Sequence, residues 1–160
     1  MDNSPVYACL TTLPDRTKSL EETIESLLPQ VDEIHLFLHG YNPVNLPAFL
    51  EDNPKIKLKY DIEWGDNGDL DMFHSVKDLN GYVIICGDDL IYPPNYVETM
   101  VKAVDKYKRK ALVSGHGSIL FPLPIADYYA DRYVYPCLGD VKGEFQVQVP
   151  GTGAMAFHTD

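Results

Sequence analysis

The sequence is poor in cysteine and in basic residues, and each shortage argues against a class of protein. Its three cysteines, Cys9, Cys86 and Cys137, follow no regular spacing. An odd, scattered set argues against a disulfide framework and predicts a reducing compartment, which we take to be the cytoplasm. Lysine and arginine total 13 against 24 aspartates and glutamates, for a formal net charge of −11. Because nucleic-acid-binding proteins need a basic face, this charge argues against nucleic acid as a partner.

Long apolar runs are also missing. A membrane-spanning helix needs roughly 20 apolar residues, and the longest candidate run, 119–126, is interrupted by Pro122 and Pro124. The first residues, Met-Asp-Asn-Ser, show neither the basic patch nor the apolar stretch of a signal peptide. The sequence therefore predicts a soluble protein without a transmembrane segment and leaves peripheral association with a membrane open. Its length of 160 residues fits a single domain, residues 1–160, with one packed core.

Strand-like and helix-like segments alternate along the chain. Short apolar or alternating runs predict strands at 6–11, 33–38, 55–60, 82–86, 111–114, 145–149 and 154–157. Helical periodicity predicts helices over 17–29 and 96–107, with weaker helical pieces at 46–51 and 70–79. The segment 115–143 is rich in tyrosine, proline and glycine and is expected to be irregular. This alternation predicts an α/β fold whose mostly parallel sheet carries helices on both faces.

The segment 81–100 is the most informative stretch of the chain. Two adjacent carboxylates, Asp88 and Asp89, directly follow the apolar run 82–86 and precede a helix start. The carboxyl end of a buried strand is where open α/β sheets place ligands. Adjacent carboxylates are hard to desolvate without a cation, and Mg²⁺ sites that also hold substrate phosphates use one or two of them. The alternative is a solvated acidic turn.

Four motifs of the chain resemble a nucleotide-sugar-dependent glycosyltransferase of the GT-A fold, closest to the family 2-like group. They are LTTLPDR at 10–16, WGDNGD at 64–69, CGDDLIYPPNYV at 86–97 and VPGTGAMAFHT at 149–159. The resemblance covers nearly the whole chain, and the last two motifs are the more specific. It implies a Rossmann-like fold, a nucleoside-diphosphate sugar as donor with uridine expected, a saccharide or other hydroxyl acceptor, and Mn²⁺ or Mg²⁺ as cofactor.

The resemblance assigns the acidic pair, which corresponds to a DXD-like motif. Asp89 matches the ligand of the divalent metal, and Asp88 matches the residue that contacts the ribose or supports the metal site. Many relatives carry a third acid where this chain has Gly87. His158 matches a histidine that contacts the metal or a phosphate in some relatives; its alternative role is packing at the surface.

Other residues match the parts that hold the nucleotide. Thr11, Thr12 and Arg16 follow the first predicted strand, where Arg16 is expected to stack on the base or to pair with a phosphate. Asp66 and Asp69 match a second loop that contacts the donor. The alternative for both places is a plain surface turn.

The loop Gly151-Thr152-Gly153 matches the small-residue loop below the sugar and the acceptor, where glycine lets the backbone approach a ligand closely. A simple turn between two strands is the alternative. His116 and the aromatic segment 121–135 are expected on the acceptor side, because sugars pack on aromatic faces.

No catalytic residue is assigned. In the family, the general base is an Asp or Glu some distance after the small-residue loop, and this sequence ends at Asp160. We therefore expect a fold truncated at its C-terminus, whose parent activity is sugar transfer with inversion. The alternative is a catalytically incompetent domain of the same fold that binds nucleotide sugars or serves as a scaffold. A nucleotidylyltransferase is less favoured, because LTTLPDR lacks the glycines of its phosphate-binding loop.

Overall fold

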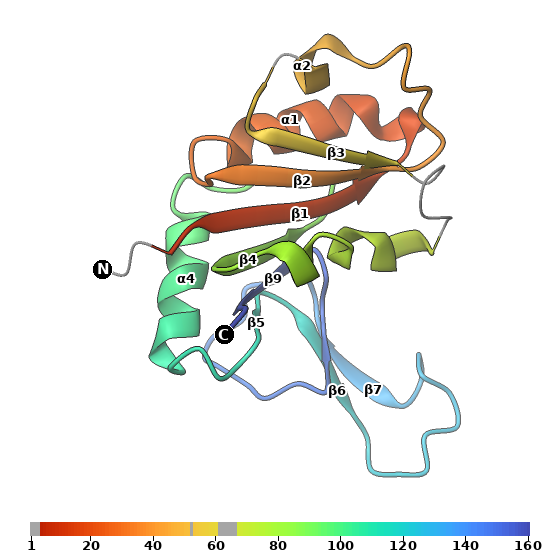
Figure 1. Ribbon diagram of the computed structural model, residues 1–160. Coiled ribbons are helices and arrows are strands. Elements are labelled where there is room, and N and C mark those ends of the chain that lie inside the picture. The colour runs from red at the N-terminus through yellow and green to blue at the C-terminus, as the bar shows by residue number, and fades with distance from the viewer. Residues whose placement is uncertain (1–3, 52, 61–66) are drawn as a thin grey trace.

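A six-stranded sheet forms the centre of the computed structural model, which describes residues 4–51, 53–60 and 67–160 (Figure 1). The strand order is β3-β2-β1-β4-β9-β5. Four strands run parallel: β1 (Val6–Thr12), β2 (Glu33–Leu38), β3 (Ile56–Tyr60) and β4 (Tyr82–Cys86). The strand β9 (Ala154–His158) lies antiparallel to β4, and β5 (Val113–Ser114) lies antiparallel to β9. The predicted mostly parallel α/β sheet is confirmed.

The central strand β4 shows why the sequence forms this sheet. All five of its residues are buried. A parallel strand covered on both faces consists of a continuous apolar run rather than an alternating one. Side chains of successive strand residues point to opposite faces, and accordingly Ile84 and Ile85 belong to two different core clusters.

The two α-helices of three turns lie on one face of the sheet. Helix α1 (Thr17–Leu27) contributes Leu20, Ile24 and Leu27 to the same buried cluster to which α4 (Tyr96–Lys106) contributes Val97 and Val104. The short helix α2 (Ala48–Glu51) adds Leu50 to this cluster.

The opposite face is covered by two 3₁₀ helices. Met72 of η2 (Gly68–Phe73) and Val76 of η3 (Val76–Asp78) pack on Val83 and Ile85 of β4. The prediction of helices on both faces is therefore corrected: α-helices cover one face, and short 3₁₀ turns cover the other.

A second, three-stranded antiparallel sheet extends from the edge of the first (Figure 1). Its order is β7-β6-β8, with β6 (Gly117–Leu120), β7 (Arg132–Tyr135) and β8 (Val149–Pro150). The prediction that 115–143 is irregular is wrong for β6 and β7, which pair from Gly117↔Tyr135 to Leu120↔Arg132. The predicted strand at 145–149 is wrong except at Val149, which with Pro150 forms β8.

No helix in the described ranges has both the length and the apolar character needed to cross a bilayer. Each of the two longer helices has 11 residues, or about 16 Å, against the roughly 30 Å of a hydrocarbon core.

Candidate functional site

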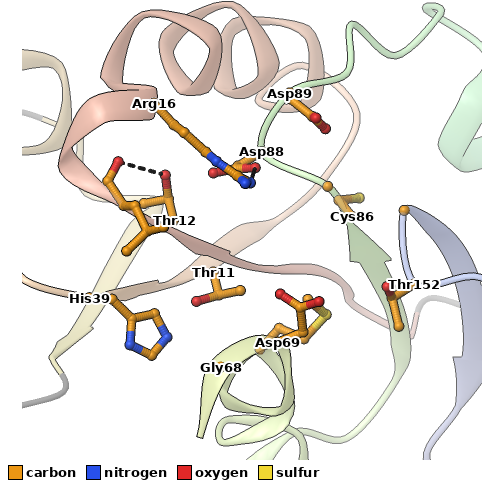
Figure 2. A pocket seen from close by; sticks show the side chains of 14 residues that line it. Thr11, Thr12, Arg16, His39, Gly68, Asp69, Cys86, Asp88, Asp89 and Thr152 are labelled. Carbon is orange, nitrogen blue, oxygen red and sulfur yellow. Dashed lines mark hydrogen bonds and ion pairs between the residues drawn. The ribbon is translucent and has the colours of Figure 1, made fainter. Parts of the chain in front are cut away.

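A cleft of about 410 Å³ lies at the edge of the sheet where the parallel strands end (Figure 2). Its volume falls within the roughly 300–1,000 Å³ that is usual for ligand sites. Thr11 and Thr12 of β1 form one part of its wall, and the loop after β4 forms another. The strand register brings these segments together, because β1 pairs in parallel with both β2 and β4. Residues that follow each strand therefore meet at one edge.

An ion pair between Arg16 and Asp88 spans the cleft wall. Arg16 belongs to the 3₁₀ helix η1 (Pro14–Arg16), and its Nη1 donates to Asp88 Oδ1 at 2.9 Å. This hydrogen bond and the charge of Asp88 raise the pKa of Arg16. Asp88 is only 3% exposed, whereas the Arg16 side chain is 51% exposed. The sequence predicted separate contacts to a nucleotide for these two residues; the structure joins them to each other.

Asp88 keeps one oxygen unused. Its Oδ2 is buried and has no hydrogen-bond partner among the described residues, and the same holds for Thr11 Oγ1. Both residues line the cleft. A buried polar atom without a partner costs about 1–3 kcal/mol, so these two atoms mark a place where a polar ligand would be stabilised.

Asp89 is exposed at the cleft and diverges from Asp88 (Figure 2). It makes no hydrogen bond or ion pair with any residue that the structure describes. Its Oδ1 lies 3.1 Å from the position that a Cβ on Gly87 would take. A side chain at position 87 would therefore approach Asp89 closely, and Asp89 would have to shift by a few tenths of an ångström. In the described part of the chain, no group of three or more His, Cys, Asp or Glu side chains forms a metal cage.

Tyr92 fixes the backbone on both sides of the cleft. Its hydroxyl donates to the Gly153 carbonyl at 2.5 Å and accepts from the Gly87 amide at 2.8 Å. Burial is the largest cause that raises the pKa of Tyr92, so the hydroxyl stays protonated and able to donate. Tyr92 thus ties the acidic loop to the small-residue loop.

Helix α1 holds the acidic loop from the other side. Thr23 Oγ1 donates to the Leu90 carbonyl at 2.8 Å, and the Tyr92 amide donates to Ser26 Oγ at 3.0 Å. Gln30 adds a bond from its Nε2 to the Pro93 carbonyl at 3.0 Å. Polar residues of α1 and of the turn that follows it therefore position the segment directly after Asp88 and Asp89.

The predicted loop Gly151-Thr152-Gly153 divides into two roles. Thr152 and Gly153 line the cleft, as the resemblance implies, but Gly151 is not among the lining residues. A Cβ on Gly151 would fall 1.9 Å from Cε1 of His116. Gly151 is therefore required to make room for the His116 imidazole rather than for a ligand.

His158 does not share the site, which corrects its predicted role as a metal ligand. In the register of β4 and β9, Ala154 lies opposite Cys86 and His158 lies opposite Tyr82. His158 is thus at the end of β4 away from Asp89. It is buried against the Tyr82 ring, with a centroid distance of 4.7 Å, and its Nδ1 accepts from the Asp160 amide at 3.2 Å.

Asp69 and Asp66 were also predicted to contact the donor. Asp69 of η2 lines the cleft and points into it (Figure 2). Asp66 lies outside the described residues.

His39 is a cleft residue that the sequence analysis missed. It follows β2, lines the cleft, and places its Nε2 3.4 Å from Oδ2 of the buried Asp71. Asp71 also accepts from the Asn67 amide at 2.8 Å and lies 2.9 Å from Nε2 of His74. The signal was present in the sequence, because residues that end neighbouring parallel strands meet at one edge.

Burial alone would raise the pKa of Asp71. The hydrogen bonds from Asn67 and the charges of His39 and His74 outweigh it, so the pKa is lowered. Asp71 is therefore a stable, ionised support beneath the cleft.

A scan against models of protein families and a search of curated proteins each find no match for this chain.

Replacement of Tyr92 by phenylalanine removes the hydroxyl that bonds the Gly87 amide and the Gly153 carbonyl, and leaves only their direct bond of 3.4 Å. We expect the free energy of unfolding to fall by about 1–3 kcal/mol, because buried backbone groups lose hydrogen bonds. Urea denaturation measures the change, and Tyr129→Phe, at an 80% exposed position, is the matched control. Equal stability of Tyr92→Phe and the control would contradict the described role.

The lowered pKa of Asp71 predicts that the stability of the fold depends on pH. A carboxylate with a lowered folded-state pKa stabilises the fold above its unfolded pKa, about 3.9, and loses this contribution as the pH falls through the folded value. We expect Asp71→Asn to be less stable at neutral pH and to lose less stability than the natural chain upon acidification. Urea denaturation between about pH 7 and pH 3 tests this, with the exposed Asp69→Asn as control. Parallel pH curves for Asp71→Asn and the natural chain would refute it.

Proposed function

We propose that this chain is the donor-binding domain of a metal-dependent glycosyltransferase of the GT-A type. It transfers a sugar from a nucleoside diphosphate, with uridine expected, to a hydroxyl of a saccharide or similar acceptor. One observation carries the proposal: the cleft at the carboxyl ends of the parallel strands holds the Asp88–Asp89 pair beside two buried polar atoms without partners, Thr11 Oγ1 and Asp88 Oδ2. A ribose diphosphate supplies hydroxyls and phosphate oxygens that suit both kinds of atom.

The polar groups of the cleft match different parts of such a donor. Asp88 Oδ2 is an acceptor for a ribose hydroxyl, while Oδ1 stays with Arg16. The guanidinium of Arg16 has five N–H donors and uses one on Asp88, so the others are available for a phosphate oxygen. Thr152 and Gly153 border the far side, where the sugar would lie.

The exposed carboxylate of Asp89 fits a divalent cation that takes its other ligands from phosphates and water. Mg²⁺ is usually bound in this way, by one or two carboxylates and the substrate, because it keeps much of its hydration. The absence of a protein-only cage among the described residues is compatible with this mode. When bound, the cation would stabilise the negative charge that develops on the diphosphate leaving group.

A divalent cation would offset the repulsion between the negatively charged chain and the donor's pyrophosphate. A formal charge of −11 repels a pyrophosphate, and Arg16 is already paired with Asp88. Asp89 therefore attracts the cation, Arg16 orients the phosphates, and Asp88 orients the ribose. The general base of the transfer stays unassigned.

A second candidate is a nucleotide-sugar-binding domain without catalysis. Gly87 stands where many relatives carry an acid, and Arg16 occupies one oxygen of Asp88. Asp89 is then the only member of the acidic pair without an ion pair among the described residues. The nucleotidylyltransferase alternative is less favoured, because the segment after β1 forms the 3₁₀ helix η1 instead of a glycine-rich phosphate loop.

Calorimetry with UDP, with and without Mn²⁺, tests the donor site. We expect Mn²⁺ to strengthen UDP binding and Asp89→Asn to weaken the binding in Mn²⁺ by about tenfold or more, because a charged metal ligand is lost. Asp78→Asn, in η3 and outside the cleft, is the matched control. UDP binding that is independent of Mn²⁺ and of Asp89 would contradict the metal role. Donor hydrolysis by the natural chain then separates an enzyme from a binding domain.

A further inference from the structure

A second groove lies between α4 and the small antiparallel sheet. Its volume is about 710 Å³, and among the described residues none lines both this groove and the cleft. We define the groove by Tyr107, which directly follows α4, His116, Tyr135 of β7 and the segment 143–147. Figure 1 shows the chain after β7, in blue, running back past the C-terminal end of α4. Neither the acidic pair nor the nucleotide role accounts for this groove.

Aromatic rings form much of the groove wall. The rings of Tyr135 and Phe145 are stacked, with centroids 4.9 Å apart and planes inclined by 18°. Phe145 is 52% exposed and Tyr107 is 42% exposed. Exposed, fixed aromatic faces of this kind offer an apolar platform for the C–H face of a sugar ring, which is apolar on its faces and polar at its rim.

Polar side chains stand beside these rings. Glu144 accepts from Lys106 Nζ at 2.6 and 2.7 Å and from the Tyr107 hydroxyl at 2.6 Å. These bonds lower the pKa of Glu144, so its carboxylate stays ionised and accepts hydrogen bonds. Gln146 also lines the groove and adds an amide that both donates and accepts. Hydroxyl groups of a sugar need this mixture of acceptors and donors.

The local charge distinguishes between ligand classes. Glu144 is neutralised by Lys106, and the chain as a whole is strongly negative. An anionic ligand would be repelled, and a hydrocarbon chain would leave the Gln146 amide without compensation. A neutral saccharide satisfies the aromatic faces and the polar groups together.

His116 forms the partition between the groove and the cleft. Its ring occupies the space beside Gly151, and its Nε2 lies 3.3 Å from the position that a Cβ on Gly153 would take. Gly153 lines the cleft, whereas His116 lines the groove. The Nε2 atom is buried and has no hydrogen-bond partner among the described residues. A ligand in the groove therefore lies one imidazole away from the loop that borders the donor cleft.

We propose that the groove formed by Tyr107, Tyr135 and segment 143–147 binds a neutral oligosaccharide at a site separate from the cleft. The saccharide site itself rests on the rings, the carboxylate and the amide of the groove.

Titration of the ¹⁵N-labelled natural chain with cellopentaose, laminaripentaose and chitopentaose tests the site by NMR. We expect at least one of them to shift the amide resonances of Gly115 and Gly143, which line the groove. We expect Phe145→Ala and Gln146→Ala each to weaken that binding, the former by about tenfold, or about 1.4 kcal/mol, because an aromatic face for the sugar is lost. Tyr129→Ala, an exposed aromatic position outside the groove, should leave the affinity unchanged.

The outcomes separate this inference from the proposed function. The inference is overturned if none of the three saccharides shifts groove resonances, if they shift only cleft resonances, or if neither groove variant weakens binding. UDP with Mn²⁺ is titrated in parallel, and its binding should be unchanged in Phe145→Ala. Groove binding without any UDP binding would support the saccharide site and defeat the glycosyltransferase proposal, whereas UDP binding without groove binding would do the reverse.

Discussion

The contact on which the cleft depends is the ion pair between Arg16 and Asp88. The two residues are 72 positions apart in the sequence, and their bond joins the turn after β1 to the loop after β4. Asp88 is almost fully buried, and a buried carboxylate needs a partner if it is to remain charged. Arg16 meets this need for one oxygen only. The other oxygen and Thr11 Oγ1 are buried without a hydrogen-bond partner among the described residues, and Asp89 is exposed. All three residues line one cavity, which gives the cleft its chemical character.

The small-residue loop and His116 lie next to one wall of that cavity. Gly151 is explained by the close approach of the His116 ring, since a Cβ there would fall 1.9 Å from Cε1. Tyr92 then bonds the Gly87 and Gly153 backbones to each other. His116 stands on the far side of this assembly, with the aromatic groove behind it. The cleft and the proposed saccharide groove are thus separated by a thin, hydrogen-bonded wall.

The sequence predicted the elements whose pattern is local. β4 is a continuous apolar run and α4 carries a helical stripe, and both follow from side-chain periodicity. The position of Asp88 and Asp89 at a sheet edge follows in turn from β4. The sequence analysis missed two features that depend on pairing between separate segments. One is the β6–β7 hairpin, whose strands are joined by the long connection 121–131, and the other is the Arg16–Asp88 bond. His158 was misplaced because the antiparallel direction of β9 carries it away from the cleft, and no local pattern reveals that direction.

The central claim is that Asp88 and Asp89 receive a ribose and a metal-bound diphosphate. A crystal of the chain grown with UDP and Mn²⁺, measured at a wavelength where manganese scatters anomalously, tests it most directly. The account predicts an anomalous peak within coordination distance of an Asp89 oxygen, and a ribose hydroxyl on Asp88 Oδ2 with the Arg16 bond retained. A nucleotide bound elsewhere on the chain, or manganese seated away from Asp89, would contradict it.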